Sequence, residues 1–297
     1  MKIPRILVAA AAIASLFAQS ESDRRRMQDI QERRSHGEQI SAEDIDFARR
    51  MMERQREQQK QISERFVKEH PPRDSTGLIP LPDLGKGTYL GEEGGLYPGG
   101  VNTPPPAHLE AGLKAAKSIL PLDAEGTSSP DGKIVLLSCG MSNTTMEFQV
   151  FQKKAAADPS INPRLVIVDG AQGGQTAKVT ANPSAHYWEV NDQRLAAAGV
   201  TPKQVQVVWI KQANGGPTEG FPEAAKKLAN DIVATLHTMH DRFPNLKIAY
   251  LSSRIYGGYA TTPLNPEPYA YEGAFAVKWI IADQIDGKGA VRAPWIA

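Results

Sequence analysis

Residues 133–143 read KIVLLSCGMSN, and this stretch decides the fold. A short apolar strand is predicted over 134–138, and Gly140 interrupts it shortly before Ser142. A helix-like segment begins at Thr144. A strand, a tight turn and a helix in this order form one unit of an α/β fold. The serine then lies at the carboxyl end of a sheet, where open α/β folds bind ligands and where a helix N-terminus presents free N–H groups.

The same alternation of short β-branched strands and amphipathic helices continues along the chain. Strands are predicted at 133–138, 164–168, 204–210 and 247–252, and helices at 107–119, 144–157, about 192–198, 222–242 and 271–285. Residues 293–297 look like the entry to one more strand. Strands that alternate with helices form βαβ units and a parallel sheet. We therefore predict an α/β domain over residues 107–297, with a central parallel sheet between layers of helices.

The first 20 residues have the features of a secretory signal peptide. Lys2 and Arg5 precede an apolar stretch over 6–18, and residues 18–20 form a small-x-small cleavage site. The stretch is shorter than the ~20 apolar residues of a membrane-spanning helix; an uncleaved anchor is the alternative. We expect a secreted or periplasmic protein without a stable membrane span after cleavage.

Two further segments precede the predicted α/β domain. Residues 21–75 are dense in Arg, Glu and Gln, which predicts a charged arm that is helical or partly disordered. Residues 76–106 form a linker rich in Pro and Gly, and its prolines argue against regular helix between 71 and 106.

The overall composition excludes several functional classes. Lys and Arg number 34 against 33 Asp and Glu, so nothing points to a nucleic-acid partner. The single cysteine, Cys139, excludes a disulfide framework and is predicted to be a buried structural thiol, with a thiol nucleophile as the alternative. His237 and His240 are spaced i, i+3 but lack a third ligand, so no metal is expected. We expect no cofactor, because no phosphate-binding glycine motif opens a helix. Nucleotide binding, with a phosphate held by the Gly-rich loops, is a weaker alternative.

Polar loops follow every predicted strand, at 139–143, 169–176, 211–216 and 253–259. In a parallel sheet these loops gather at one edge, where we predict a site. A serine nucleophile needs an exposed hydroxyl, a base, and donors for the oxyanion. Ser142 is the candidate nucleophile, and Gly174 and Asn214 are candidate oxyanion donors, although an ordinary turn and a loop-capping asparagine are the alternatives for these two. The candidate substrate-binding residues are Asn143, Gln175 and Arg254.

Three of these loops resemble sequence blocks of the SGNH (GDSL-like) hydrolases. Residues 140–142 (GMS) resemble the Gly-Asp-Ser block, 173–176 (GGQT) the glycine block and 212–215 (QANG) the Gly-x-Asn-Asp block. The resemblance covers roughly residues 130–285. It implies a flavodoxin-like three-layer sandwich, with Ser142 as the nucleophile and with Gly174 and Asn214 holding the oxyanion.

The chain also departs from the family pattern. Met141 and Gly215 replace acidic residues, and the Asp-x-x-His block that supplies the base and its acid is absent. We therefore expect a C-terminally incomplete chain that is inactive or nearly so. Among the histidines of the chain, His186 is the candidate for a substitute base.

Two functions from different classes follow. The first is an exported serine esterase that hydrolyses ester bonds of a small-molecule, carbohydrate or lipid substrate through an acyl-enzyme, as the resemblance implies. The second is a non-catalytic SGNH-like protein that binds a glycan or peptide. In that case the polar loops would act together with the aromatic residues Tyr256, Tyr259, Tyr269, Tyr271 and Trp279.

Overall fold

The computed structural model describes residues 21–35, 38–289, 291 and 294–297. The chain divides into two units. The arm unit comprises residues up to 72 together with 261–263, and the α/β unit comprises 73–260 and 264–297. The Pro- and Gly-rich segment 76–106 therefore belongs to the α/β unit. The predicted signal peptide, residues 1–20, lies outside the described residues.

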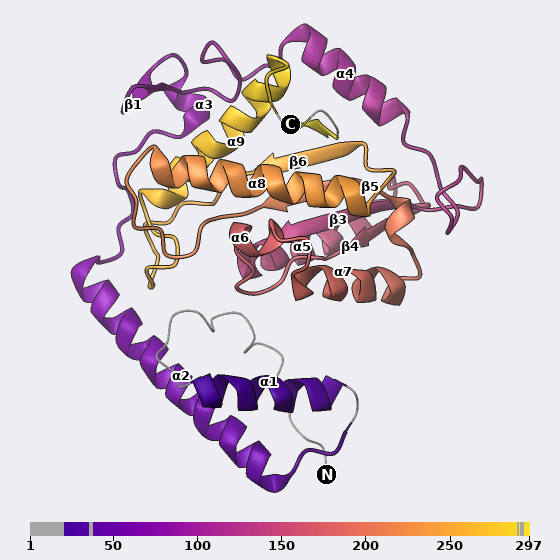
Figure 1. Ribbon diagram of the computed structural model, residues 1–297. Coiled ribbons are helices and arrows are strands. Elements are labelled where there is room, and N and C mark those ends of the chain that lie inside the picture. Colours follow the sequence, from indigo (N-terminus) through magenta and orange to yellow (C-terminus); the bar gives the residue numbers. More distant parts are fainter. Residues whose placement is uncertain (1–20, 36–37, 290, 292–293) are drawn as a thin grey trace. The chain divides into compact units, whose positions relative to one another are not determined.

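The α/β unit is built on a five-stranded parallel sheet with the strand order β4-β3-β5-β6-β7 (Figure 1). The strands are β3 (Ile134–Gly140), β4 (Leu165–Val168), β5 (Val205–Lys211), β6 (Ile248–Ser252) and β7 (Trp295–Ile296). Helices flank the sheet, so the predicted α/β class and the flavodoxin-like three-layer sandwich are confirmed. The strand expected within 293–297 is β7, which pairs with β6.

The helices of this unit follow the predicted alternation, with two corrections. They are α3 (Leu81–Leu84), α4 (Pro106–Lys117), α5 (Ser142–Ala156), α6 (Ala177–Thr180), α7 (His186–Ala197), the 3-10 helix η1 (Pro202–Gln204), α8 (Glu223–Arg242) and α9 (Tyr269–Ile285). The predicted start of α7 near residue 192 is wrong, because Tyr187 and Trp188 are buried in the core and extend the helix towards its N-terminus.

The expectation that prolines exclude helix from 71–106 is also wrong at α3. Pro82 lies in the first turn of this helix, where its missing N–H would have no intrahelical partner. The same segment contains a short antiparallel ladder of β1 (Thr88–Tyr89) and β2 (Glu92–Glu93).

Alternation of side chains along β5 separates the two faces of the sheet. Trp209 stacks on Phe148 of α5 with ring centroids 5.7 Å apart. Its neighbours Val208 and Ile210 point to the opposite face. They join a buried cluster to which α8 and α9 also contribute. The sheet is therefore covered by apolar side chains on both faces, as parallel sheets require.

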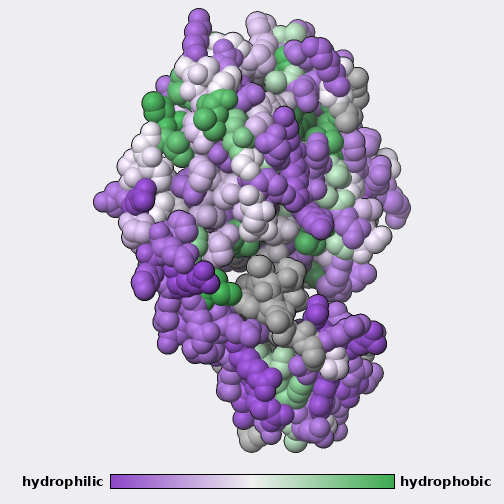
Figure 2. Space-filling model, turned by 60° about the vertical axis from the view of Figure 1, so that its left-hand side comes forward, coloured by the Kyte–Doolittle hydropathy of each residue, from purple (hydrophilic) through white to green (hydrophobic). Residues whose placement is uncertain are grey.

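The arm unit consists of α1 (Glu21–Ser35) and α2 (Ala42–Glu69), which confirms the predicted helical arm. Its surface is mostly hydrophilic in the view of Figure 2. Within the described residues, no helix of either unit combines the length and apolar character needed to cross a membrane.

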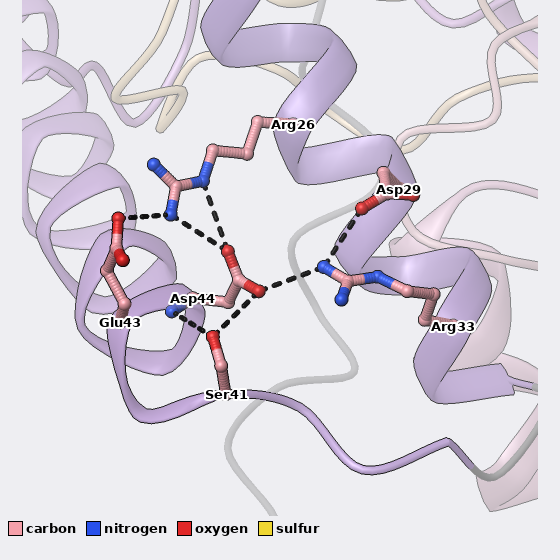
Figure 3. Close-up of polar contacts among 6 residues, drawn as sticks. All are labelled: Arg26, Asp29, Arg33, Ser41, Glu43 and Asp44. Atoms are coloured by element: carbon pink, nitrogen blue, oxygen red, sulfur yellow. Dashed lines mark hydrogen bonds and ion pairs between the residues drawn. The ribbon is translucent and has the colours of Figure 1, made fainter.

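One buried carboxylate joins the two arm helices (Figure 3). Asp44 accepts hydrogen bonds from Arg26 Nη2 at 2.9 Å, from Arg33 Nη2 at 2.9 Å and from Ser41 Oγ at 2.9 Å. The Ser41 hydroxyl in turn caps α2 by accepting from the Asp44 backbone N–H. Hydrogen bonds from Arg26, then Arg33 and Ser41, lower the pKa of Asp44 to about 2.

Candidate functional site

The strand order creates a topological switch point between β3 and β5. The chain passes from β3 to β4 on one side, and the next strand, β5, pairs with β3 on its other side. In open α/β sheets, ligands bind in the crevice outside the carboxyl ends of the strands at such a point. Gly140 and Lys211 face each other at these strand ends. Ser142 follows the first strand and Asn214 follows the second, so both lie in loops at this edge of the sheet.

Ser142 is the first residue of the 15-residue helix α5, and its side chain is exposed. The N-cap residue, Met141, provides no side-chain cap, so the first-turn N–H groups stay available to an anion. Gly140 makes the tight entry possible, because a Cβ there would collide with Thr144 and with the Lys211 carbonyl. Among the described residues, none hydrogen-bonds to the Ser142 hydroxyl.

The loop after β4 is held by groups that the sequence did not single out. The Ser138 hydroxyl donates to Asp169 Oδ1 at 2.7 Å and accepts from the Gly170 N–H at 3.1 Å. Arg194 Nη1 donates to the carbonyls of Asp169 and Ala171 at 2.7 and 2.8 Å. The sequence feature that could have predicted these contacts is Ser138 itself, a serine within an apolar strand, because a buried hydroxyl requires a hydrogen-bond partner.

This fixed loop brings Gly173 next to the nucleophile candidate. The Gln172 N–H donates to the Gly140 carbonyl at 3.0 Å, which joins the loop to the end of β3. A Cβ built on Gly173 would lie 3.9 Å from the Ser142 Cβ, so the two residues are neighbours. Gly174 follows with a φ of 72°, a conformation that glycine adopts without strain. Its N–H donates to no described residue.

Asn214 lies in a loop that meets the same region, but its amide is partly occupied. The Ala177 N–H donates to the Ala213 carbonyl at 3.1 Å and joins the loops after β4 and β5. Asn214 Nδ2 donates to the Ala224 carbonyl in α8 at 2.7 Å. An amide nitrogen carries two hydrogens, so one remains for a ligand.

The three candidate substrate-binding residues occupy different places. Asn143 follows Ser142, and its Nδ2 is buried without a hydrogen-bond partner. The Gln175 carbonyl accepts from Gln212 Nε2 at 3.1 Å, so the Gln175 backbone ties the loop after β4 to the end of β5. Arg254 follows β6 and lines a separate cavity that includes none of Ser142, Gly174 and Asn214.

An ion pair with a buried lysine and a partly exposed glutamate lies beside the switch point and was not predicted. Lys211 has a side chain only 2% exposed, and its Nζ lies 2.5 and 2.6 Å from the two carboxylate oxygens of Glu147. Burial lowers the pKa of Lys211, and the hydrogen bonds that Lys211 donates to Glu147 oppose this shift. Arg254 acts electrostatically on the same lysine and on Glu147. Glu147 therefore acts electrostatically on two cations, and Lys211 is the one that donates hydrogen bonds to it. A lysine at the end of an otherwise apolar strand was the signal for such a site.

The alternative nucleophile, Cys139, and the histidines of the described residues do not interact with Ser142. Cys139 is fully buried, and burial raises the pKa of its thiol to about 12, which confirms the structural interpretation. His186 Nδ1 lies 2.6 Å from Glu189 Oε2 on the exposed start of α7. His237 and His240 are exposed on α8. No histidine in the described part of the chain hydrogen-bonds to Ser142, and no cluster of metal-ligating side chains occurs there.

The arrangement offers an exposed hydroxyl, an uncapped helix N-terminus and a neighbouring glycine loop at the carboxyl edge of the sheet. These are the groups that hold and attack a carbonyl. A search of protein-family models and a search of curated proteins find no match for this chain.

Proposed function

We propose that this protein is an exported serine esterase-like hydrolase that cleaves ester bonds of a small-molecule, carbohydrate or lipid substrate. The observation that carries the proposal is the exposed Ser142 at the open N-terminus of α5, beside the switch point and next to Gly173. The order of the three loops that resemble SGNH hydrolase blocks supports the same reaction class.

In this proposal Ser142 Oγ attacks the acyl carbon, and its proton passes to a base. The oxyanion of the tetrahedral intermediate accepts hydrogen bonds from the Ser142 and Gly174 N–H groups and from the free hydrogen of Asn214 Nδ2. One such donor contributes about 3 kcal/mol of barrier lowering. Collapse breaks the bond to the alkoxide, which takes the proton back from the base and leaves as the alcohol. Water, deprotonated by the same base, then attacks the acyl-enzyme, and the acid leaves as Ser142 Oγ regains its proton. The resemblance assigns the base to an Asp-x-x-His block, which the printed sequence lacks.

A soluble base can stand in for that histidine in the test. We expect 4-nitrophenyl acetate to be hydrolysed slowly by the 297-residue chain and faster when imidazole is added. Ser142→Ala should remove the whole protein-dependent rate at every imidazole concentration. Subtracting the Ser142→Ala rate also removes the reaction of imidazole with the ester.

The matched control is Ser184→Ala, since Ser184 is an exposed serine near the start of α7 whose hydroxyl makes no hydrogen bond with a described residue. It should keep the full rate. An acetylated Ser142 found by mass spectrometry after rapid quenching would support the acyl-enzyme directly. Equal rates for wild type and Ser142→Ala would rule out Ser142 as the nucleophile.

A second function is a non-catalytic glycan- or peptide-binding protein. The absence of a base next to Ser142 among the described residues favours it. Exposed Tyr256 and Tyr259, which meet edge to face at 5.6 Å, also offer a surface on which sugars stack. Glycan binding that survives Ser142→Ala, together with no Ser142-dependent hydrolysis, would select this function.

A further inference from the structure

The α/β unit contains a second candidate site, a cavity of about 480 Å³ that is lined by the end of β6 and by α9. Its walls come from α9, the segments 76–82 and 96–97, and the loop after β6. The wall is largely apolar and includes Leu78, Leu81, Leu251, Ala274, Val277 and Ile281. Ligand pockets of ~300–1,000 Å³ with such linings bury small organic molecules.

Two of the charged groups in this wall are already satisfied. Glu267 accepts the backbone N–H groups of Gly257 at 2.7 Å and of Tyr271 at 3.0 Å. Lys278 Nζ donates to the carbonyls of Glu93, at 2.6 Å, and Gly94. Both charges hold the local structure together and have little capacity left for a ligand.

Arg254 is different. It makes no hydrogen bond or ion pair with any residue that the structure describes, and its Nε is buried without a partner. Glu147 acts on it electrostatically but is hydrogen-bonded to Lys211. Burial lowers the pKa of Arg254, which reflects the cost of holding its charge away from water. Buried polar groups are normally paired, so this guanidinium lacks an anionic partner.

We propose that this cavity binds a monocarboxylate with a hydrocarbon body, whose carboxylate pairs with Arg254. A guanidinium matches a carboxylate in shape and donates two parallel hydrogen bonds to it. One unpaired cation matches one negative charge better than the two of a phosphate monoester. The apolar wall then covers the hydrocarbon part. The inference is independent of the esterase proposal, because Ser142 does not line the cavity.

The first test compares octanoate with 1-octanol, which has the same chain but no charge, by titration calorimetry on the full chain. Wild type should bind octanoate at least about tenfold more tightly than 1-octanol, the effect of one charged hydrogen-bonded pair. Arg254→Gln should abolish this difference and leave 1-octanol binding unchanged. Arg164→Gln, which alters a surface arginine paired with Asp131, is the control and should behave as wild type.

The second test fills the cavity. Ala274 lies on α9 and lines it, so Ala274→Phe should weaken octanoate and 1-octanol equally, by tenfold or more. Ala196→Phe, on an exposed part of α7, should change neither affinity. Circular dichroism verifies that each variant is folded.

Three results with carboxylate ligands would overturn the proposal. They are no octanoate binding by wild type, an octanoate preference that survives Arg254→Gln, and acetate binding as tight as octanoate. The last would show that the hydrocarbon body contributes nothing. Tighter binding of octyl phosphate than octanoate would also exclude a monocarboxylate as the preferred ligand.

Discussion

At the scale of single residues, Gly173 and Gly174 place different demands on the site. A side chain on Gly173 would meet only Ser142, at an ordinary contact distance of 3.9 Å, and its backbone lies outside the left-handed region. Gly174 has a φ of 72°, where a Cβ costs roughly 1 kcal/mol. Gly173 can therefore be enlarged without backbone strain, and the added atoms would occupy space beside the proposed nucleophile.

Gly173→Leu should lower the rate of Ser142-dependent hydrolysis of 4-nitrophenyl butyrate at least about tenfold. The added side chain would displace the ester from the serine hydroxyl, and a displacement of about 1 Å can lower the rate by about 10²-fold. The melting temperature should stay near that of wild type. Gly220→Leu is the control, since Gly220 also lacks left-handed geometry and a Cβ there meets nothing within 4 Å. An unchanged rate in Gly173→Leu would mean that substrate does not approach Ser142 from this loop.

At the scale of elements, polar side chains decide how neighbouring segments meet. Ser138 and Arg194 hold the loop after β4 against β3 and α7. In the arm, Asp44 at the start of α2 binds two arginines of α1, Arg26 and Arg33. Ile30 of α1 and Ala48 and Met51 of α2 are also buried. Because the rest of α1 is strongly polar, we expect the charge of Asp44 to contribute much of the α1–α2 pairing.

Asp44→Asn should accelerate amide hydrogen exchange across residues 21–69 and leave β3, β5 and β6 unchanged. Asp46→Asn, which alters an exposed pair with Arg49, is the control and should have little effect. The pKa of Asp44 is about 2, below its ordinary value of 3.8. The ionised carboxylate therefore stabilises the arm fully above pH 3.8, and this stabilisation is lost as the pH falls through 2. Wild type and Asp44→Asn should therefore converge near pH 2. A difference that persists there would exclude the carboxylate as its cause.

At the scale of the whole molecule, the α/β unit has one continuous core that both the sheet and its helices share. Leu236 of α8 is fully buried in the cluster that contains Val208 and Ile210 of β5. All four tryptophans (Trp188, Trp209, Trp279 and Trp295) belong to this unit. Tryptophan fluorescence of the full chain therefore reports on the α/β unit and not on the arm.

Leu236→Ala should lower the free energy of unfolding by about 2–5 kcal/mol, the usual effect of deleting a fully buried leucine and leaving a cavity. Urea unfolding followed by tryptophan fluorescence measures the change. Leu113→Ala is the control, because Leu113 on α4 is 53% exposed and should cost under about 0.5 kcal/mol. A loss as small as that of the control would mean that the core around α8 repacks freely.

Local patterns predicted the fold class well. The alternation of strands rich in β-branched residues with amphipathic helices predicted the parallel sheet. Gly140 before Ser142 predicted the turn at the carboxyl edge of this sheet. These features depend on neighbouring residues, so periodicity and turn chemistry suffice. The start of α7 was missed because it depends on the burial of Tyr187 and Trp188 in a core made by distant segments.

The chemistry of the sites needed the tertiary structure. Sequence order put Ser142 and the loops around Gly174 and Asn214 at one edge, but only packing turned the Asn214 amide towards Ala224 and buried Lys211 against Glu147. The cavity beside Arg254 is lined by residues 76–82 and by α9, which lie near opposite ends of the α/β unit in the sequence. Local pattern thus determined which elements form and the edge at which they end. Long-range packing determined which polar groups find partners and which remain open to a ligand, because a hydrogen bond or a cavity depends on side chains that are close in space rather than in sequence.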